Sequence, residues 1–266
     1  MQEVTSMNQN PHESAATAEL LLSCILDMGE ILLTSGAEVV RVEDTLTRLC
    51  HAYGFTKVDV FTITSSIVLT VRQPNGSVFT QTRRITARDT NLNRIALVNS
   101  LSRRLCQSPL ELSALQQAIE EIRQDSHYPS WVQLLAYIII SAAFTLFFGG
   151  TVLDALGACI SGAVLFLTQS WVKRLNINSI LQSLVTCAVT ALAVVLLVRL
   201  GIGCKASSIS IGNIMLLIPG VALTTALRDI INGDTISGIL GICEAVVKAL
   251  AVAIGFAAVL VQMGGL

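Results

Sequence analysis

The first 128 residues alternate apolar and polar positions with the periods of helices and strands. Apolar residues recur at helical spacing over 21–32 and again over 39–53, with Gly36 between the two runs. This spacing predicts two amphipathic helices separated at the glycine. Residues 58–72 and 77–84 are rich in β-branched side chains and flank an Asn-Gly dipeptide. They predict a small antiparallel sheet with a tight turn.

Helical spacing returns after Asp89. Ser108, Pro109 and Glu111 have the order of an N-cap, a first-turn proline and a capping-box glutamate, so we expect a helix to begin there. Its buried stripe is predicted to be Leu112, Leu115, Ile119 and Ile122. The predicted order of elements is helix, helix, sheet, helix, helix, which is an α+β domain over residues 1–128.

Long apolar runs dominate residues 129–266, which are predicted to form an all-α membrane domain. The first four runs each have 18 or more uncharged residues, enough to cross a bilayer. The last run is interrupted by Glu244 and Lys248. We therefore predict five transmembrane helices, at about 131–153, 155–172, 175–198, 206–227 and 239–263.

Composition and charge agree with this division. The chain is 53% hydrophobic and 13% charged, and 11 Lys+Arg and 14 Asp+Glu lie in residues 1–128 against 6 and 4 in residues 129–266. Soluble domains average roughly 25% charged residues. The net charge of -1 provides no basic field for nucleic acid, and the seven cysteines contain no CxxC pair. The sequence predicts a lipid bilayer environment, no nucleic-acid partner and no metal site.

The expected orientation follows from the amino terminus and from the loops. The first residues contain neither a basic segment nor an apolar segment of a secretory signal, so we expect the α+β domain in the cytoplasm. Five crossings then place the carboxyl terminus outside the inner (plasma) membrane. The expected inner loops carry Lys173, Arg174 and Arg228, and the outer loops carry Arg199 and Lys205.

No nucleotide-binding, nucleophile-elbow or zinc-protease motif occurs, so we predict no catalytic residues and no cofactor. Glu43, Asp44, Arg48 and His51 lie within two turns of one predicted helix. They are interpreted as a solvated helix face, with a binding or regulatory surface as the alternative.

Arg83 and Arg84 end the second strand-like stretch. They are interpreted as solvated strand charges, and the alternative is contact with lipid headgroups or a partner subunit.

Polar residues inside the apolar runs are the candidates for a transport path. Glu244 and Lys248 lie four apart on one helix face, and a pair within the membrane would have to face protein or water. The alternative is that the last span begins after Lys248, which then reaches the membrane surface.

Asn213 and the Pro219-Gly220 pair break the fourth run. Proline removes a backbone donor, and transporters often bind substrate at such a broken helix, although a plain kink is equally common. Asp154 is a weaker candidate near the start of the second run and is more consistent with an interfacial position.

Three stretches of the chain match a known family. They are Gly36-Ala37-Glu38 followed by Val42-Glu43, the segment SSIVLT at 65–70, and residues 216–238. The last contains the most specific pattern: Pro219, Gly220, Arg228, Asp229, Gly233, Asp234 and Gly238. With these motifs, essentially the whole chain resembles the threonine/serine exporter (ThrE) family, in its YjjP-like subunit.

This resemblance implies a cytoplasmic domain, five spans and ion-driven export of small hydroxy amino acids. It also implies a second small membrane subunit, since the chain resembles the unfused form of the family. Glu38, Glu43, Arg83 and Arg84 are the candidates in the cytoplasmic domain. The residues leave the solute open, because Lys248 and Arg228 with a protonated Glu244 would also suit a dicarboxylic acid. A membrane-anchored regulatory or scaffold protein and a membrane hydrolase are the further alternatives.

Overall fold

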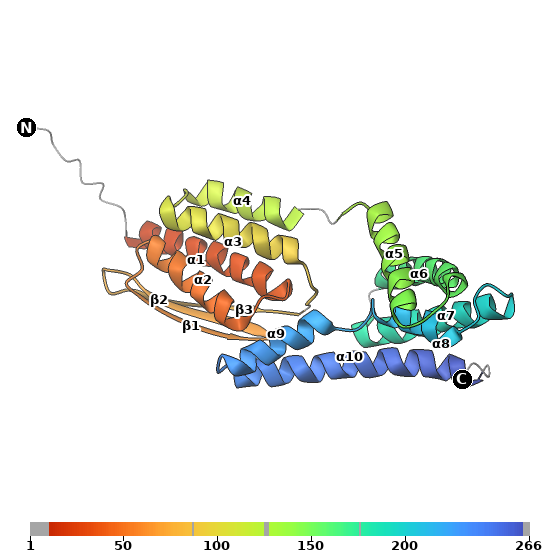
Figure 1. Ribbon diagram of the computed structural model, residues 1–266. Helices are drawn as coiled ribbons and strands as arrows, with labels where there is room; N and C mark the ends of the chain where they lie inside the picture. Colours follow the sequence, from red (N-terminus) through yellow and green to blue (C-terminus); the bar gives the residue numbers. More distant parts are fainter. Residues whose placement is uncertain (1–10, 87, 125–127, 176, 263–266) are drawn as a thin grey trace, which may run out of the picture. The chain divides into compact units, whose positions relative to one another are not determined.

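The computed structural model describes residues 11–86, 88–124, 128–175 and 177–262 (Figure 1). Contacts divide the chain into two compact units. The amino-terminal unit contains residues up to 125 together with 221–241, and the helical unit contains residues 126–220 and 242–266.

The two amphipathic helices predicted at the start of the chain are confirmed. α1 (Pro11–Thr34) and α2 (Val39–Ala52) are separated by a turn in which Gly36 has φ +90°. An L side chain rarely adopts that conformation, which explains a glycine there. The predicted stripes supply much of the core of the amino-terminal unit, including fully buried Met28, Leu32, Leu46 and Leu49 on the two helices.

The predicted antiparallel sheet is also confirmed. It consists of β1 (Lys57–Ile63), β2 (Ser66–Arg72) and β3 (Val78–Arg84), hydrogen-bonded in the order β1-β2-β3. Gly76 occupies the expected turn between β2 and β3 with φ +90°. The central strand contributes three buried side chains, Ile67, Leu69 and Val71, to the core.

The next two helices are α3 (Leu92–Gln107) and α4 (Leu112–Gln124). The expected helix start at Ser108 and Pro109 is wrong by about three residues, because Ser108 instead closes α3, with its N–H bonded to Arg104 O. The connection is held by the Tyr53 hydroxyl, which donates to Leu110 O at 3.1 Å. α1 and α2 contact the sheet, and α3 and α4 form a further layer (Figure 1).

α9 (Gly220–Ile231) and the start of α10 (Thr235–Gln262) pack closely within the same amino-terminal unit. A Cβ atom at Gly238 would lie 2.6 Å from the Ala226 carbonyl oxygen. That distance leaves no room for any side chain. The glycine of the signature therefore permits the close approach of α9 to α10.

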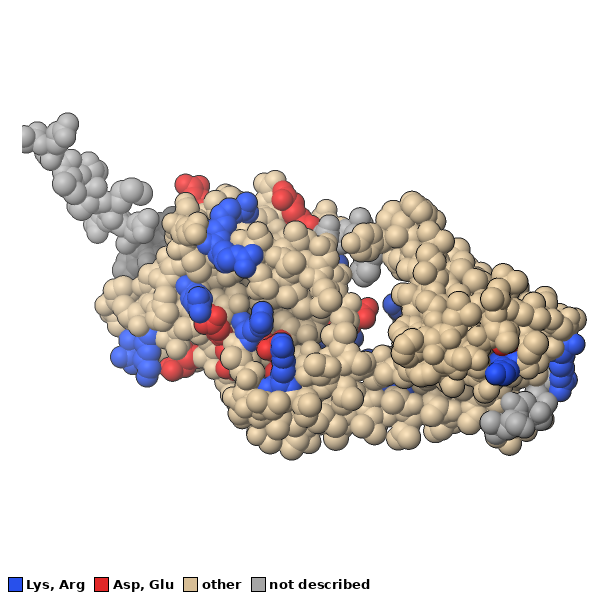
Figure 2. Space-filling model, in the orientation of Figure 1, with Lys and Arg blue, Asp and Glu red and all other residues tan. Residues whose placement is uncertain are grey.

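The helical unit contains α5 (Ser130–Phe147), α6 (Val152–Lys173), α7 (Ser179–Arg199), α8 (Ala206–Ile214) and the later part of α10. Among the described residues, four helices are long and apolar enough to cross a membrane: α5, α6, α7 and α10. On the face drawn in Figure 2, charged side chains gather over the amino-terminal unit, and few are seen over α5 to α8.

The structure does not contain the single helix predicted over 206–227. α8 ends at Ile214 and α9 begins at Gly220, so the segment predicted as the fourth span is two short helices separated by five residues. Pro219 has no N–H to donate, and the residue before a proline is disfavoured in helical conformation. These two effects account for the interruption, and an uninterrupted fifth spanning helix is not confirmed.

The last predicted span is longer than expected towards its amino end. α10 runs without a break through Glu244 and Lys248, and its 28 residues would extend about 42 Å. The charged pair therefore lies inside a continuous helix. Met263, the predicted end of the span, lies outside the described residues.

Candidate functional site

The family-like pattern around Asp229 meets the first turn of α2. The Val39 backbone N–H donates to Asp229 Oδ1 at 3.1 Å, and Asp229 is only 2% exposed. The first N–H groups of a helix have no partner inside the helix. Glu38, at the N-cap of α2, makes no side-chain capping bond. Asp229 therefore supplies from α9 the acceptor that α2 lacks.

Arg228 forms a second link between the same two segments. Its guanidinium is paired with the Glu38 carboxylate, which also lies 3.7 Å from Arg41. The Arg228 side chain is 59% exposed and that of Glu38 is 17% exposed. Because one partner faces solvent, we expect the ion pair to contribute less to stability than the buried Asp229 bond.

Two more carboxylates, those of Glu43 and Asp234, complete this cluster. Glu43 accepts a hydrogen bond from the Thr62 N–H at 2.8 Å, which links α2 to β1. Burial raises the pKa of Glu43, the Thr62 bonds oppose the rise, and the charge of Asp234 adds to it. We call Glu38, Glu43, Arg228, Asp229 and Asp234 the α2–α9 cluster.

Asp229 has the same kind of electrostatic environment. Burial raises its pKa, and the charges of Asp234 and Glu38 act in the same direction. The Val39 N–H and Arg88 oppose the rise. The cluster thus concentrates negative charge around a helix N-terminus, where backbone N–H groups favour it.

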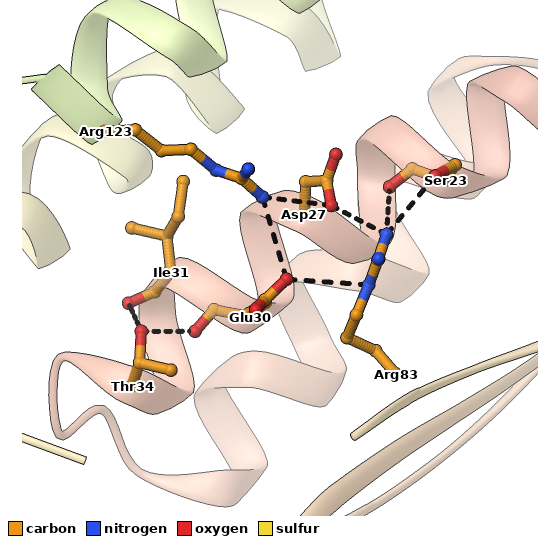
Figure 3. A network of polar contacts seen from close by, with 7 residues as sticks. All are labelled: Ser23, Asp27, Glu30, Ile31, Thr34, Arg83 and Arg123. Atoms are coloured by element: carbon orange, nitrogen blue, oxygen red, sulfur yellow. Dashed lines mark hydrogen bonds and ion pairs between the residues drawn. The ribbon is translucent and has the colours of Figure 1, made fainter. Parts of the chain in front are cut away.

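The two strand arginines lie apart from this cluster. Arg83 Nη2 is 2.6 Å from Asp27 Oδ1, and its Nε is 3.5 Å from Glu30. Arg123 of α4 joins the same two carboxylates at 3.1 and 3.6 Å (Figure 3). Arg83 is thus a structural link between β3 and α1 rather than a solvated charge, whereas Arg84 is exposed.

In the helical unit, Asn213 is the centre of a buried polar network. The Ser141 hydroxyl donates to Asn213 Oδ1 at 2.9 Å, and Asn213 Nδ2 donates to Ser161 Oγ at 2.7 Å and to Ile209 O at 2.9 Å. Asn213, Ser141 and Ser161 are each 0% exposed. We call these three side chains the Asn213 node. It connects α5, α6 and α8.

The node depends on unusually close helix packing. A Cβ atom at Gly212 would lie 2.5 Å from the Ser141 carbonyl oxygen, and one at Gly162 would lie 2.9 Å from Ser141 Cβ. Small residues at both positions let α6 and α8 approach α5.

Several buried hydroxyl groups near these helices were not anticipated from the sequence. The Thr145 hydroxyl donates to Ser141 O and the Thr190 hydroxyl to Thr186 O, each at 2.8 Å. Within the described part of the chain, the hydroxyls of Thr186 and Ser210 are buried without a hydrogen-bond partner. Single hydroxyls in an apolar run form no motif. The spacing of four between Ser141 and Thr145, and between Thr186 and Thr190, was the available signal.

Asp154 has a well-defined local role. It is fully buried, forms a capping box with Thr151 at the start of α6, and accepts hydrogen bonds from the N–H groups of Cys204 and Lys205 at 2.6 and 2.9 Å. Its carboxylate thereby holds the connection between α7 and α8. A further role in transport stays a prediction.

The remaining candidates are not brought together by ion pairs among the described residues. Glu244 is exposed and Lys248 is half-buried on α10, and no ion pair joins them in the residues that the structure covers. Pro219 and Gly220 mark the break between α8 and α9. Within the described residues, no group of His, Cys, Asp or Glu side chains could hold a metal ion.

Comparison with known proteins decides the family. The family model described as "Putative threonine/serine exporter" matches residues 23–263, which includes both the α2–α9 cluster and the Asn213 node. The chain belongs to the threonine/serine exporter family. This family is one of membrane transporters and not of enzymes.

Individual relatives differ in length and in name. The chain is 21% identical to the "Probable threonine/serine exporter" of Mycobacterium tuberculosis over 88% of its own length and 45% of that protein. It is 24% identical to the "Threonine/serine exporter" of Corynebacterium glutamicum, over 79% of this chain and 44% of that one. The chain thus spans less than half the length of these two exporters.

A third relative has nearly the same extent. The "Probable succinate transporter subunit YjjP" of Klebsiella aerogenes is 24% identical over 97% of this chain and 98% of that protein. No solved structure matches the chain.

Proposed function

We propose that this chain is one subunit of a secondary transporter that exports threonine and serine across the inner membrane. Its family supports the transporter class, and two of the relatives are named as threonine/serine exporters. The observation that carries the substrate proposal is the Asn213 node, with further hydroxyls on the same helices. Amide and hydroxyl groups both donate and accept hydrogen bonds, as the hydroxyl of threonine or serine requires.

The two unpartnered hydroxyls add to this argument. Thr186 and Ser210 are buried on α7 and α8, and no partner is found for either hydroxyl among the described residues. A buried polar group without a hydrogen bond is costly and calls for an explanation. We infer that they offer alternative bonds to a solute that moves past α8.

The path of the chain supports a broken fourth crossing. Residues 221–241 belong to the same compact unit as α1 to α4, so we infer that they lie on the same side of the bilayer as those helices. After three crossings by α5, α6 and α7, the chain has to return before α9. The only helix described in that stretch is α8, whose nine residues extend roughly 14 Å of a core about 30 Å thick.

We infer that α8 and the following residues up to Pro219 form this fourth crossing, with α10 as the fifth. The amino-terminal unit would then be cytoplasmic and the carboxyl terminus exterior. An interrupted crossing frees backbone carbonyls, which transporters use to coordinate the coupling ion, and helix N-termini, which they use to bind anionic groups of the substrate. Pro219 and Gly220 thus remain candidates for the transport path.

Glu244 and Lys248 are proposed to serve the charged ends of the solute. A zwitterionic amino acid needs an acid and a base near each other, and the two side chains lie one turn apart on α10. Neither is fully buried within this chain, so both are available to a solute or to a second subunit. If they act in transport, Glu244→Gln and Lys248→Met should each abolish export at normal membrane insertion; near-normal export by both would remove the pair from the mechanism.

The second candidate substrate is a small dicarboxylic acid. It is favoured by the relative of nearly equal extent, which is named as a probable succinate transporter subunit. In that case Lys248 would bind one carboxylate, with Glu244 protonated, and a second cation would be needed for the other. Arg228, however, is already paired with Glu38, which favours the amino-acid substrate.

A second small membrane subunit is the proposed partner. The word "subunit" in the name of one relative supports it. Many large apolar side chains on α5, α6 and α10 are exposed, such as Phe147, Trp171 and Ile254. These surfaces suit lipid and a partner helix.

The proposal is tested by efflux from cells that lack their own threonine export. The chain is expressed with and without the small membrane subunit, and the efflux of labelled L-threonine, with or without competing L-serine or succinate, is measured beside the efflux of labelled succinate. We expect efflux only with both proteins, inhibited by serine and not by succinate. Efflux of succinate without efflux of threonine would favour the dicarboxylate, and efflux from the chain alone would contradict the partner. Correct insertion with no efflux of either solute would favour a scaffold.

A further inference from the structure

The amino-terminal unit contains a cavity of about 290 Å³ between α1 and α4. Leu20 and Ile119 form apolar parts of its wall, and Ser23, Asp27, Glu120 and Arg123 supply polar groups. Ligand sites in proteins begin at about this size and combine apolar walls with a few polar groups. The cavity therefore suits a molecule with only a few heavy atoms.

The charged residues around the cavity differ in how they are paired. Arg123 is 3.1 Å from Asp27 and 3.6 Å from Glu30, and Arg83 is 2.6 Å from Asp27 (Figure 3). Each of these charges therefore has an opposite charge beside it. Arg123 engages both carboxylates through one nitrogen, Nη2. A guanidinium carries five N–H donors, so others can serve an incoming carboxylate.

Glu120 is a further charged residue of the wall, and it is exposed. It accepts a hydrogen bond from Gln124 Nε2 at 2.8 Å. No ion pair within the described parts of the chain includes Glu120. A carboxylate without a cation beside a cavity favours a ligand that brings a positive charge.

These features select the class of ligand. A small zwitterion can direct its ammonium to Glu120 and its carboxylate to Arg123, while its side chain contacts Leu20 and Ile119. A dicarboxylate would meet two wall carboxylates, Asp27 and Glu120, against one guanidinium that is already paired. Repulsion between the like charges of the ligand and the wall disfavours a dicarboxylate.

We propose that the cavity between α1 and α4 binds a free amino acid with a small side chain. This is a second amino-acid site, distinct from the membrane helices. The zwitterion follows from the wall charges, and the choice of threonine and serine among zwitterions rests on the proposed function. A site of this kind would let the exporter respond to the solute that it removes.

Cys24 provides a local probe, because it lines the cavity and its residue is 4% exposed. The purified full chain in detergent is treated with a maleimide, and modification of each cysteine is followed by mass spectrometry. We expect saturating L-threonine or L-serine to slow Cys24 modification at least fivefold, and succinate to have no effect. Modification of exposed Cys106 should be unchanged by either compound.

Two neighbouring glutamates provide a matched pair of variants. Glu120→Gln should raise the half-protecting concentration of L-threonine about tenfold, as expected for the loss of one charge-assisted contact. Glu121→Gln, which changes an exposed residue outside the cavity wall, should leave it unchanged. Equal shifts in both variants, or equal protection by succinate, would overturn the proposal. Equilibrium dialysis with labelled L-threonine makes the same comparison without relying on Cys24 reactivity.

The outcome is separable from that of the proposed function. Asn213→Ala should reduce export and keep Cys24 protection, because Asn213 belongs to the helical unit. Absent protection and absent dialysis binding, with export intact, would contradict the cavity site alone. Protection in a chain that exports no amino acid would support the site and contradict the proposed function.

Discussion

Asp229 accepts a hydrogen bond from the backbone N–H of Val39 across 190 residues of sequence. The bond joins the most specific pattern in the chain to the first turn of α2. Together with the ion pair of Arg228 and Glu38, this bond brings two separate family-like motifs, at residues 36–43 and 216–238, into one contact region. The α2–α9 cluster thus has a structural role that its residue types alone did not reveal.

Removing the Asp229 carboxylate should loosen the start of α2. Asp229→Ala leaves the buried Val39 N–H without its acceptor, which costs about 1–3 kcal/mol. Asp229→Asn retains an acceptor oxygen and should cost less. Hydrogen exchange of the peptide containing Val39 should accelerate clearly in the alanine variant and only slightly in the asparagine variant. Unchanged exchange in both would show that the bond does not stabilise the helix start; Asp44→Asn, on the exposed face of α2, is the control.

The pair of Glu38 and Arg228 can be tested by charge reversal. Because Arg228 is largely exposed, we expect a coupling free energy below about 1 kcal/mol. Glu38→Arg and Arg228→Glu each place like charges together, and the double variant restores an opposite pair. Thermal unfolding of the four proteins should show the double variant closer to wild type than either single variant. Simple additivity of the two changes would contradict a direct interaction.

The pKa of Glu43 predicts a pH dependence. Burial raises this pKa above its ordinary value of about 4.3, so the folded protein holds the proton more tightly than the unfolded protein. The associated stability is present below the ordinary value and is lost as pH rises through the raised pKa. Glu43→Gln keeps an oxygen for the Thr62 N–H and removes the charge.

Relative to wild type, Glu43→Gln should therefore be more stable at pH 7 than at pH 4. Unfolding midpoints in urea at the two pH values measure this difference. Asp44→Asn, at an exposed carboxylate one residue away, is the matched control and should show no such gain. An equal effect of Glu43→Gln at both pH values would contradict a raised pKa.

Local patterns were sufficient to predict much of the fold. The periodic stripes of α1, α2 and α4 and the Asn-Gly turn depend on neighbouring residues, and they agree with the structure. The interruption after α8 was signalled by Pro219 and Gly220, yet the apolar composition of 206–227 outweighed it in the prediction. Composition measures whether a segment tolerates hydrocarbon, and it does not show whether the helix is continuous.

The site required information that no local pattern contains. Glu38 and Arg228 were both candidates, but their contact depends on how α9 packs within the amino-terminal unit. Arg83 was interpreted as a solvated charge because its acidic partners lie 53 and 56 residues away on α1. Ser141 and Ser161 were missed, because a single serine in an apolar helix is usually neutral.

Labelling from outside the cell tests the proposed five crossings. Cys204 lies in the connection between α7 and α8 and is exposed, whereas Cys106 is exposed on α3. An impermeant maleimide should modify Cys204 in intact cells and reach Cys106 only after permeabilisation. Modification of Cys106 in intact cells would contradict a cytoplasmic amino-terminal unit.

The Asn213 node is the feature on which the proposed transport path depends most. Asn213→Ala removes the shared partner of Ser141 and Ser161, and Ser161→Ala removes one arm of the node. Ser207→Ala, at an exposed position on α8, is the matched control. All three variants should insert into the membrane, since each removes polar atoms and adds no charge.

The most direct measurement is the initial rate of labelled L-threonine efflux, normalised to membrane-inserted protein, with the small membrane subunit present. We expect Asn213→Ala to lower the rate at least tenfold and Ser161→Ala to lower it less, while Ser207→Ala exports like wild type. Near-normal efflux by Asn213→Ala at normal insertion would contradict a transport path through the node.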